Sequence, residues 1–267
     1  MKLFRVLVIG DVVGKPGRKA CEFYIRRLKS MEKIDFVIAN VENVAGGSGI
    51  TESSARELFQ YGVDVMTSGD HIFKKKEVIT ILKDNHKILR PANYPAGVPG
   101  CGGIVVESMS GIKVGVLNLM GRVFLKPVDC PFEAARRELE GMRKETPVIF
   151  VDIHAEATSE KIALGWFLDG RVSAVFGTHT HVQTADEQIL PHGTGYITDL
   201  GMCGPYRSVI GREVDPVIEH FLTQMPVHMD VATGDVRLAG AIFDIDPETG
   251  KTVQVRRVME RIPDGTE

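Results

Sequence analysis

The chain has 267 residues, of which 43% are hydrophobic and 25% are charged, and its formal net charge is −3. These values are ordinary for a soluble globular protein, and this length favours one large α/β domain over residues 1–267. The near balance of 32 basic and 35 acidic residues argues against a dedicated binder of duplex nucleic acid, which usually carries a basic stripe.

Cysteine usage and apolar runs indicate the cellular setting. The four cysteines are scattered without a CxxC pair, which favours free thiols in a reducing cytoplasm over a zinc ribbon or a disulfide scaffold. Residues 1–5 lead straight into a strand-like run, so no signal peptide is expected. The longest apolar runs are too short to span a bilayer, and we therefore expect a cytoplasmic protein with no membrane partner.

The first half of the chain alternates apolar, β-branched runs with amphipathic stretches. A strand at residues 4–9 precedes a turn at 14–17 and a helix that reaches Met31, with Pro16 near its start. A strand at 36–41 is followed by a Gly-rich loop and a helix that Thr51 opens and that runs to about Tyr61. A third strand, at 63–67, precedes a helix at 75–83.

The second half begins with the Pro/Gly-rich residues 91–103, the best candidate for a mobile loop or for the edge of a small cap. Thereafter we expect, in chain order, a hairpin of strands 104–106 and 113–119, a helix at 131–142, a strand at 148–153, a helix at 160–168, and strands at 174–176, 196–199 and 241–245. Alternation of strands and helices predicts an α/β protein with helices on the sheet faces, and the hairpin indicates a mixed sheet.

Metal-capable side chains follow five of the predicted strands. In open α/β sheets, functional groups gather outside the carboxyl ends of the strands, so all five sets are expected around one crevice. A single Asp or His after a strand is more often a cap or a satisfied loop residue, but the joint pattern predicts a metal centre. Its candidate ligands are Asp11, Glu42, Asn43, Asp70, His154, His179 and His181.

The chemistry of these ligands indicates the kind of centre. Imidazole and carboxylate without thiolate suit iron, manganese, zinc or similar ions. Seven ligands are too many for one tetrahedral zinc, but they suit two ions about 3.5–4 Å apart that share a bridging carboxylate. Residues two apart on an extended segment point to the same face, so a turn at His179-Thr180-His181 is needed to aim each histidine at a different metal.

In this order, Asp11, Glu42-Asn43, Gly69-Asp70-His71, His154 and Gly177-Thr178-His179-Thr180-His181 resemble the motifs of the calcineurin-like metallophosphoesterase superfamily. The closer resemblance is to its YmdB-like branch, similar to bacterial 2′,3′-cyclic-nucleotide phosphodiesterases. The strings that carry it lie at residues 9–18, 40–43, 118–124, 152–158, 177–183 and 198–205, and the likeness covers nearly the whole chain.

The resemblance implies a layered sandwich of mixed β-sheets flanked by helices, with a small cap as an option. It also implies that one metal is held by Asp11, Glu42, Asn43 and His181 and the other by Glu42, Asp70, His154 and His179, so that Glu42 bridges. His71 is then the catalytic general acid. The implied ions are iron (Fe²⁺/Fe³⁺) or manganese (Mn²⁺), with zinc (Zn²⁺) or magnesium (Mg²⁺) as alternatives.

Three positions depart from the superfamily pattern. Its usual Asp-x-His is Asp11-Val12-Val13 here, and its usual bridging Asp is Glu42, with Asn43 filling the vacated position; the YmdB-like branch shares both departures. The third departure is from the branch as well, which has Asn where this chain has Asp70. The added carboxylate lowers the net charge of a two-metal site, and we hypothesise that it favours a more oxidised or harder metal pair, or a less charged substrate.

The expected reaction is hydrolysis of a phosphodiester or phosphomonoester, in which a hydroxide bridging the metals attacks phosphorus and His71 protonates the leaving oxygen. The resemblance alone implies a 2′,3′-cyclic nucleotide as the substrate. The substrate partner is thus a small phosphoester. The alternatives are a nuclease or RNA-processing phosphodiesterase, and a regulatory protein that acts through partner binding.

Three further segments have open interpretations. Residues 14–18 could hold phosphate on backbone N–H groups, or form a plain turn. Arg122 could clamp a phosphate or base, or form a surface ion pair. Apolar residues near 205–217 could form an interface, and a homo-oligomer, dimer or tetramer, is expected.

Overall fold

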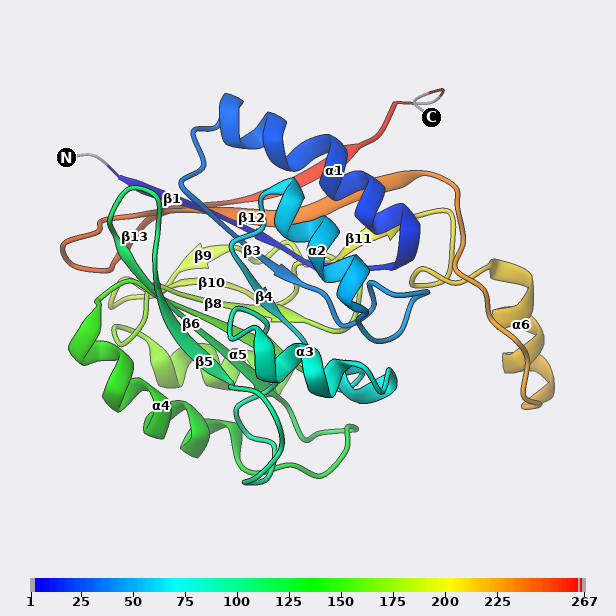
Figure 1. Cartoon of the computed structure of the whole chain (residues 1–267), viewed down its shortest axis with the longest axis horizontal. Coiled ribbons are helices and arrows are strands. Elements are labelled where there is room, and N and C mark those ends of the chain that lie inside the picture. Colours follow the sequence, from blue (N-terminus) through cyan, green and yellow to red (C-terminus); the bar gives the residue numbers. More distant parts are fainter. Residues whose placement is uncertain (1–2, 264, 266–267) are drawn as a thin grey trace.

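The computed structural model describes residues 3–263 and 265 and has the expected α/β architecture. Two mixed β-sheets face one another, and helices cover the outer face of each sheet, which gives a four-layer sandwich (Figure 1). Within the described residues, no helix is long and apolar enough to cross a membrane.

The first sheet contains the amino-terminal strands and the carboxyl-terminal hairpin. Its order is β2-β11-β12-β1-β3-β4, with β13 paired to β12, and β1, β3 and β4 are parallel. The strands are β1 (Phe4–Ile9), β2 (Asp11–Val12), β3 (Phe36–Asn40), β4 (Val65–Thr67), β11 (Met202–Pro205), β12 (Val236–Ile245) and β13 (Thr252–Arg261). The neighbouring helical elements are α1 (Gly14–Met31), α2 (Glu52–Tyr61), η1 (Ile72–Lys74) and α3 (Val78–Asp84).

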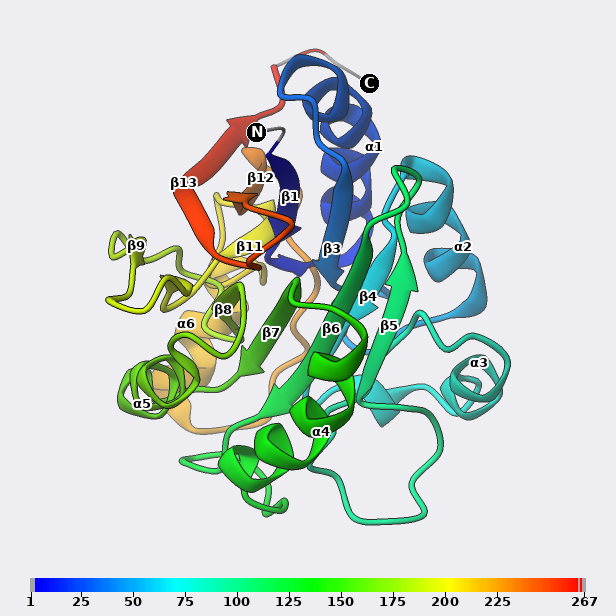
Figure 2. The same ribbon diagram turned by 90° about the vertical axis from the view of Figure 1, so that its left-hand side faces the viewer.

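The second sheet has the order β5-β6-β7-β8-β10-β9, in which β6, β7, β8 and β10 are parallel. The strands are β5 (Gly103–Glu107), β6 (Lys113–Met120), β7 (Ile149–His154), β8 (Ala174–Thr178), β9 (Gln188–Ile189) and β10 (Gly195–Ile197). The antiparallel β5–β6 pair is the hairpin that the sequence predicts. Helices α4 (Pro131–Glu145) and α5 (Thr158–Leu168) cover its outer face (Figure 2).

Alternation along the strands separates the hydrophobic cores. On β1, Leu7 and Ile9 pack in the cluster formed with α1 and α2, whereas Val6 and Val8 face the core between the sheets. That central core contains aromatic residues from both sheets, including Phe150 and Phe243 in edge-to-face contact. The central strands of each sheet are therefore buried on both faces.

Local differences from the sequence prediction have identifiable causes. The helix predicted at 75–83 begins later, at Val78, because Lys75 is extended after a separate 3₁₀ turn that ends at Lys74. The turn predicted at 14–17 is instead the first turn of α1. Residues 91–102 contain no helix or strand, and the segment is anchored where Ala92 N–H donates to the Asn118 carbonyl oxygen.

One helix, α6 (Val214–Thr223), was not predicted. It is set apart from the two sheets at the edge of the molecule (Figure 1). Phe221 is 70% exposed and Leu222 79% exposed. The interface predicted from the sequence at 205–217 includes the exposed residues Ile210 and Val214, whereas Pro205 is buried in β11. An interface there stays a prediction.

Candidate metal centre

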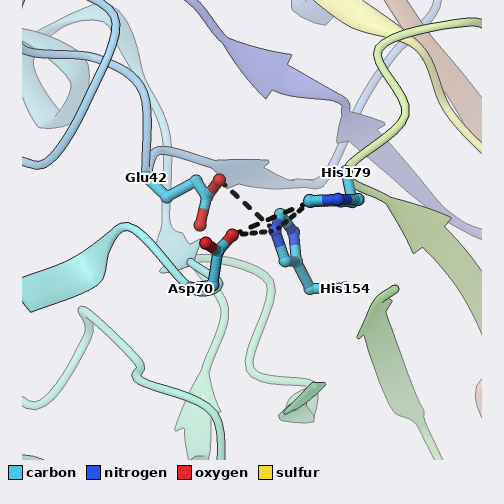
Figure 3. Close-up of side chains that lie close together, drawn as sticks. All are labelled: Glu42, Asp70, His154 and His179. Carbon is cyan, nitrogen blue, oxygen red and sulfur yellow. Dashed lines mark hydrogen bonds and ion pairs between the residues drawn. The ribbon is translucent and has the colours of Figure 1, made fainter. Parts of the chain in front are cut away.

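Four of the predicted ligands converge on one point. Glu42, Asp70, His154 and His179 each offer one ligand atom, and these atoms lie within 4.8 Å of one another (Figure 3). Glu42 and Asp70 follow strands of the first sheet, whereas His154 ends β7 and His179 follows β8 in the second sheet. The cluster thus joins the two sheets at the carboxyl ends of their parallel strands, as the strand-end rule predicts.

The centre of this cluster is the buried Nε2 atom of His154. It lies 3.1 Å from His179 Nδ1, 3.3 Å from Glu42 Oε1 and 3.5 Å from Asp70 Oδ1. Glu42 is itself held in place, because the backbone N–H of His71 donates to its Oε2 at 3.0 Å. Two imidazole nitrogens and two carboxylate oxygens, all of them atoms that bind metals, therefore lie close together.

Asp11, Asn43 and His181 form a second group beside the first. Asp11 Oδ1 lies 3.8 Å from His181 Nε2, and the Asn43 side-chain nitrogen lies 3.2 Å from that same Nε2 atom. The Asn43 nitrogen is also 3.2 Å from Glu42 Oε1. Glu42 therefore contacts both groups, which is the position that a bridging carboxylate must occupy.

A left-handed turn separates the two histidines of the His179-Thr180-His181 segment. Their φ angles are 101° and 65°, a conformation that residues other than glycine rarely adopt. His179 faces His154, whereas His181 faces Asp11 and donates from Nδ1 to the Ile210 carbonyl oxygen at 2.9 Å. The turn thereby directs the two imidazoles to different groups.

A buried ion pair supports this strained turn. Lys161 on α5 is fully buried, and its Nζ donates to Asp199 Oδ2 at 2.6 Å. The same oxygen accepts the backbone N–H of Thr180, between the two histidines, at 3.2 Å. Such conformations persist where the surroundings fix them. The sequence alone does not indicate a role for Lys161, because burial of a lysine has no local signature.

The charges of the cluster shift its pKa values. Burial alone would raise the pKa of Asp70, but the close imidazole of His154 and the charges of the other nearby histidines together lower it. Burial and the charge of His154 lower the pKa of His179 to about 4. Desolvation raises the pKa of Asp11, which is completely buried. In the metal-free chain, the protonation state of each of these side chains therefore depends on the charges of its neighbours.

The donor set fits metal ions. Among the described residues, Asp11 Oδ1 and Asp70 Oδ1 are buried without a hydrogen-bond partner, although buried polar atoms are nearly always satisfied. The partnerless oxygens belong to the two different groups, and imidazole and carboxylate donors surround them. A cation bound between each oxygen and its neighbours would satisfy both atoms.

His71 lies at the open side of the cluster, with a third of its side chain exposed. Its Nδ1 is 2.8 Å from Asn43 Oδ1, and its Nε2 is 3.7 Å from Asp70 Oδ2.

Sequence reasoning missed the half-exposed Glu156, whose Oε2 lies 3.2 Å from His179 Nε2. A carboxylate that holds the second nitrogen of a metal-binding histidine is a frequent arrangement.

Residues 14–18 and Arg122, whose interpretation the sequence left open, make the following contacts. Arg18 donates to Glu57 and to the Val44 carbonyl oxygen, and so links α1 to α2 and to the loop after Asn43. The Arg122 side chain is exposed, and its backbone N–H is held by Glu160. A role of Arg122 in substrate binding stays a prediction.

The four-layer sandwich with this cluster at its strand ends fits a metal-dependent hydrolase, the class expected from the sequence, and the relatives support that class. The YmdB-like protein family matches residues 7–258. The 2′,3′-cyclic-nucleotide 2′-phosphodiesterase of Bacillus subtilis is 49% identical over 255 residues, which cover 96% of each chain. A putative phosphatase/phosphodiesterase of Mycoplasma pneumoniae is 34% identical, over 98% of this chain and 96% of the relative.

Solved structures agree with these relatives. A hypothetical protein from Thermus thermophilus superimposes with a TM-score of 0.91 at 42% identity, over 97% of this chain and all of its own. A phosphatase from Mycoplasma pneumoniae gives a TM-score of 0.92 at 33% identity, over 99% of this chain and 96% of its own. The chain belongs to the YmdB-like protein family, and the resemblance found in the sequence is confirmed.

Proposed function

We propose that this protein is a dinuclear-metal phosphodiesterase that hydrolyses 2′,3′-cyclic nucleotides. The observation that carries the proposal is the convergence of Glu42, Asp70, His154 and His179, with Asp11, Asn43 and His181 alongside. The printed name of the Bacillus subtilis relative supports the cyclic nucleotide as the substrate.

In this proposal, the first metal is held by Asp11, Glu42, Asn43 and His181, and the second by Glu42, Asp70, His154 and His179. The position of Glu42 between the two groups supports its bridging role. The mixed nitrogen and oxygen donors, without thiolate, support iron or manganese, with zinc or magnesium as alternatives.

Binding of the first metal requires one rearrangement of Asn43. Its amide nitrogen now faces His181, and its oxygen faces His71. A half-turn of the amide exchanges the two atoms, so that the oxygen becomes available as a ligand. The nitrogen then donates to Nδ1 of His71, which leaves the His71 proton on Nε2.

When bound, the two cations supply an activated water and neutralise charge on the phosphoryl group. The chain provides the rest. Buried carboxylates and imidazoles fix the geometry, and His71, at the open side, donates a proton to the departing ribose oxygen. Its accessibility and its contact with Asn43 support this role over that of a residue that only orients the site.

The decisive experiment measures turnover of 2′,3′-cyclic AMP and of bis-p-nitrophenyl phosphate by the metal-stripped chain reconstituted with Mn²⁺ or Fe²⁺. The His71→Ala variant is compared with His86→Ala, which removes an exposed histidine outside the cluster. The proposal is supported if the wild type and His86→Ala turn over both substrates, whereas His71→Ala no longer turns over 2′,3′-cyclic AMP. Turnover of the generic diester alone contradicts the cyclic substrate, and no turnover favours the regulatory alternative.

We further propose that the chain acts as a single domain and assembles into a cytoplasmic homo-oligomer. The exposed apolar residues of α6 and of the segment after it support self-association, because a second copy would bury them. They are Ile218, Phe221, Leu222 and Met225. Light scattering after size exclusion tests this, and a monomeric mass at micromolar concentration contradicts it.

A further inference from the structure

A buried polar network lies directly behind the cluster, where the two sheets meet. Asn40 and Thr67 come from β3 and β4 of the first sheet, and Asp152 and Thr178 come from β7 and β8 of the second. Each is at most 1% exposed. A buried carboxylate is costly unless donors satisfy it, so this network requires an explanation.

Three side chains satisfy the Asp152 carboxylate. Its Oδ2 accepts from Asn40 Nδ2 at 3.1 Å and from Thr67 Oγ1 at 2.5 Å, and its Oδ1 accepts from Thr178 Oγ1 at 2.8 Å. Thr178 Oγ1 has two further contacts: it accepts from Asn40 Nδ2 at 3.3 Å, and it lies 2.9 Å from His154 Nδ1. Asp152 is therefore linked through one hydroxyl to the central histidine of the metal cluster.

The count of hydrogen atoms fixes the direction of this chain of hydrogen bonds. An ionised carboxylate only accepts, and a threonine hydroxyl has a single hydrogen to donate. Thr178 therefore gives its hydrogen to Asp152 and must accept the hydrogen of His154 Nδ1. With a proton on Nδ1, the neutral imidazole carries its lone pair on Nε2, the atom that faces Glu42, Asp70 and His179.

We propose that Asp152 is a positioning residue that acts through the Thr178 hydroxyl to hold His154 in the tautomer and orientation that bind the second metal. This rests on the two-metal site proposed above. Metal-binding histidines commonly donate their other ring N–H to an acceptor that orients them, and here a hydroxyl stands between the imidazole and the carboxylate. No role for Asp152 or Thr178 follows from the ligand motifs alone.

Replacement of Asp152 by Asn tests the direction of the hydrogen bonds that link His154, Thr178 and Asp152. The Oδ2 position receives two donors, Asn40 and Thr67, so the new amide group best places its oxygen there. Its nitrogen then faces Thr178, whose hydroxyl must accept from Asn and donate to His154 Nδ1. The proton of the neutral imidazole moves to Nε2, where it competes with the metal.

The experiment titrates Mn²⁺ into the metal-stripped full-length chain by calorimetry and compares Thr178→Val, Thr178→Ser, Thr67→Val and Asp152→Asn. Thr67→Val is the matched control, because Thr67 donates to the same carboxylate but lies on β4, and its hydroxyl has no hydrogen bond to His154. Unfolding of each metal-free variant is measured in parallel.

We expect Thr178→Val and Asp152→Asn to weaken one of the two Mn²⁺ sites by about tenfold to a hundredfold, the usual effect of losing such a partner. Thr178→Ser and Thr67→Val are expected to keep wild-type affinity at both sites, although Thr67→Val lowers stability. This pattern separates positioning from a purely structural role, which would move stability and affinity together.

Equal loss of affinity in Thr67→Val and Thr178→Val would overturn the proposal, as would wild-type affinity in Thr178→Val. Failure of the proposed function has a different signature: the metal-loaded wild type binds two Mn²⁺ ions but turns over neither diester. The positioning role is then judged from the affinities alone.

Discussion

The Nδ1 atom of His71 lies 2.8 Å from the Oδ1 atom of Asn43, which links the proposed proton donor directly to a proposed metal ligand. The two roles are therefore coupled, because the orientation of the Asn43 amide determines which nitrogen of His71 carries the proton. Both residues follow strands of the first sheet, after β3 and β4, which are parallel neighbours.

Replacement of His71 by Asn should affect substrates according to their leaving groups. Protonation by a positioned side chain contributes about 10²–10⁴-fold to a rate, so we expect a loss of that size in kcat for 2′,3′-cyclic AMP, whose ribose oxygen leaves as a strong base. Bis-p-nitrophenyl phosphate releases a stabilised anion and should lose much less. Steady-state kinetics on both substrates measure the difference, and equal losses on both would show that His71 is a structural or metal-orienting residue instead.

Replacement of Asp70 by Asn tests the negative charge that Asp70 adds to those of Asp11 and Glu42 in the proposed two-metal site. Asp70 Oδ1 is buried without a hydrogen-bond partner beside His154, so its charge acts directly on a cation there. We expect Asp70→Asn to bind less iron, with a smaller Fe³⁺ fraction, and to have an altered turnover rate. Metal analysis of the purified protein and its turnover rate give the answer. No change in metal content or rate would sink the charge hypothesis.

Much of the fold and of the candidate site could be predicted from strand periodicity and strand ends. His154 ends one apolar strand and His179 directly follows another, and parallel strands carry such residues to one edge, so their convergence could be anticipated. The supporting residues Lys161, Asp152 and Thr178 could not be found this way. A polar side chain on a strand or helix has the same local pattern whether it is exposed or buried against another sheet.

The helix α6 escaped prediction for a related reason. Val217 is buried, but Ile218, Phe221 and Leu222 of this helix are exposed, so its apolar residues do not form the continuous buried stripe of a helix packed on a sheet. The late start of the helix predicted at 75–83 depends on the extended backbone at Lys75, which the apolar spacing does not encode.

Replacement of Lys161 by Met should destabilise the chain and loosen the histidine turn. The substitution leaves Asp199 buried without its cation, and removal of one partner of such a pair costs about 3–5 kcal/mol. Arg256→Met is a matched control, because Arg256 pairs with Glu32 at a partly exposed site, where an ion pair contributes about 0–1 kcal/mol. Urea unfolding of the metal-free variants measures both, and comparable losses would contradict a special role for the buried pair.

After removal of the metals, the folded chain should become less stable as pH rises above about 6.5. In the metal-free chain, burial alone would lower the pKa of His154, but Glu42, Asp70 and Asp11 raise it well above its ordinary value. A pKa that is higher in the folded state than in the unfolded state contributes stability that is fully present below about pH 6.5 and is lost as pH rises through the folded-state pKa.

A metal at Nε2 must displace that proton, so metal affinity rises with pH over the same range. We therefore expect the Tm of the chelated chain to fall from about pH 6.5 upward, while the increase in Tm that Mn²⁺ produces grows. Differential scanning calorimetry with and without Mn²⁺ measures both slopes, and His154→Gln removes the proton-binding group as a control. If the metal-free wild type and His154→Gln have the same pH slope, His154 is not the group that exchanges its proton for the metal.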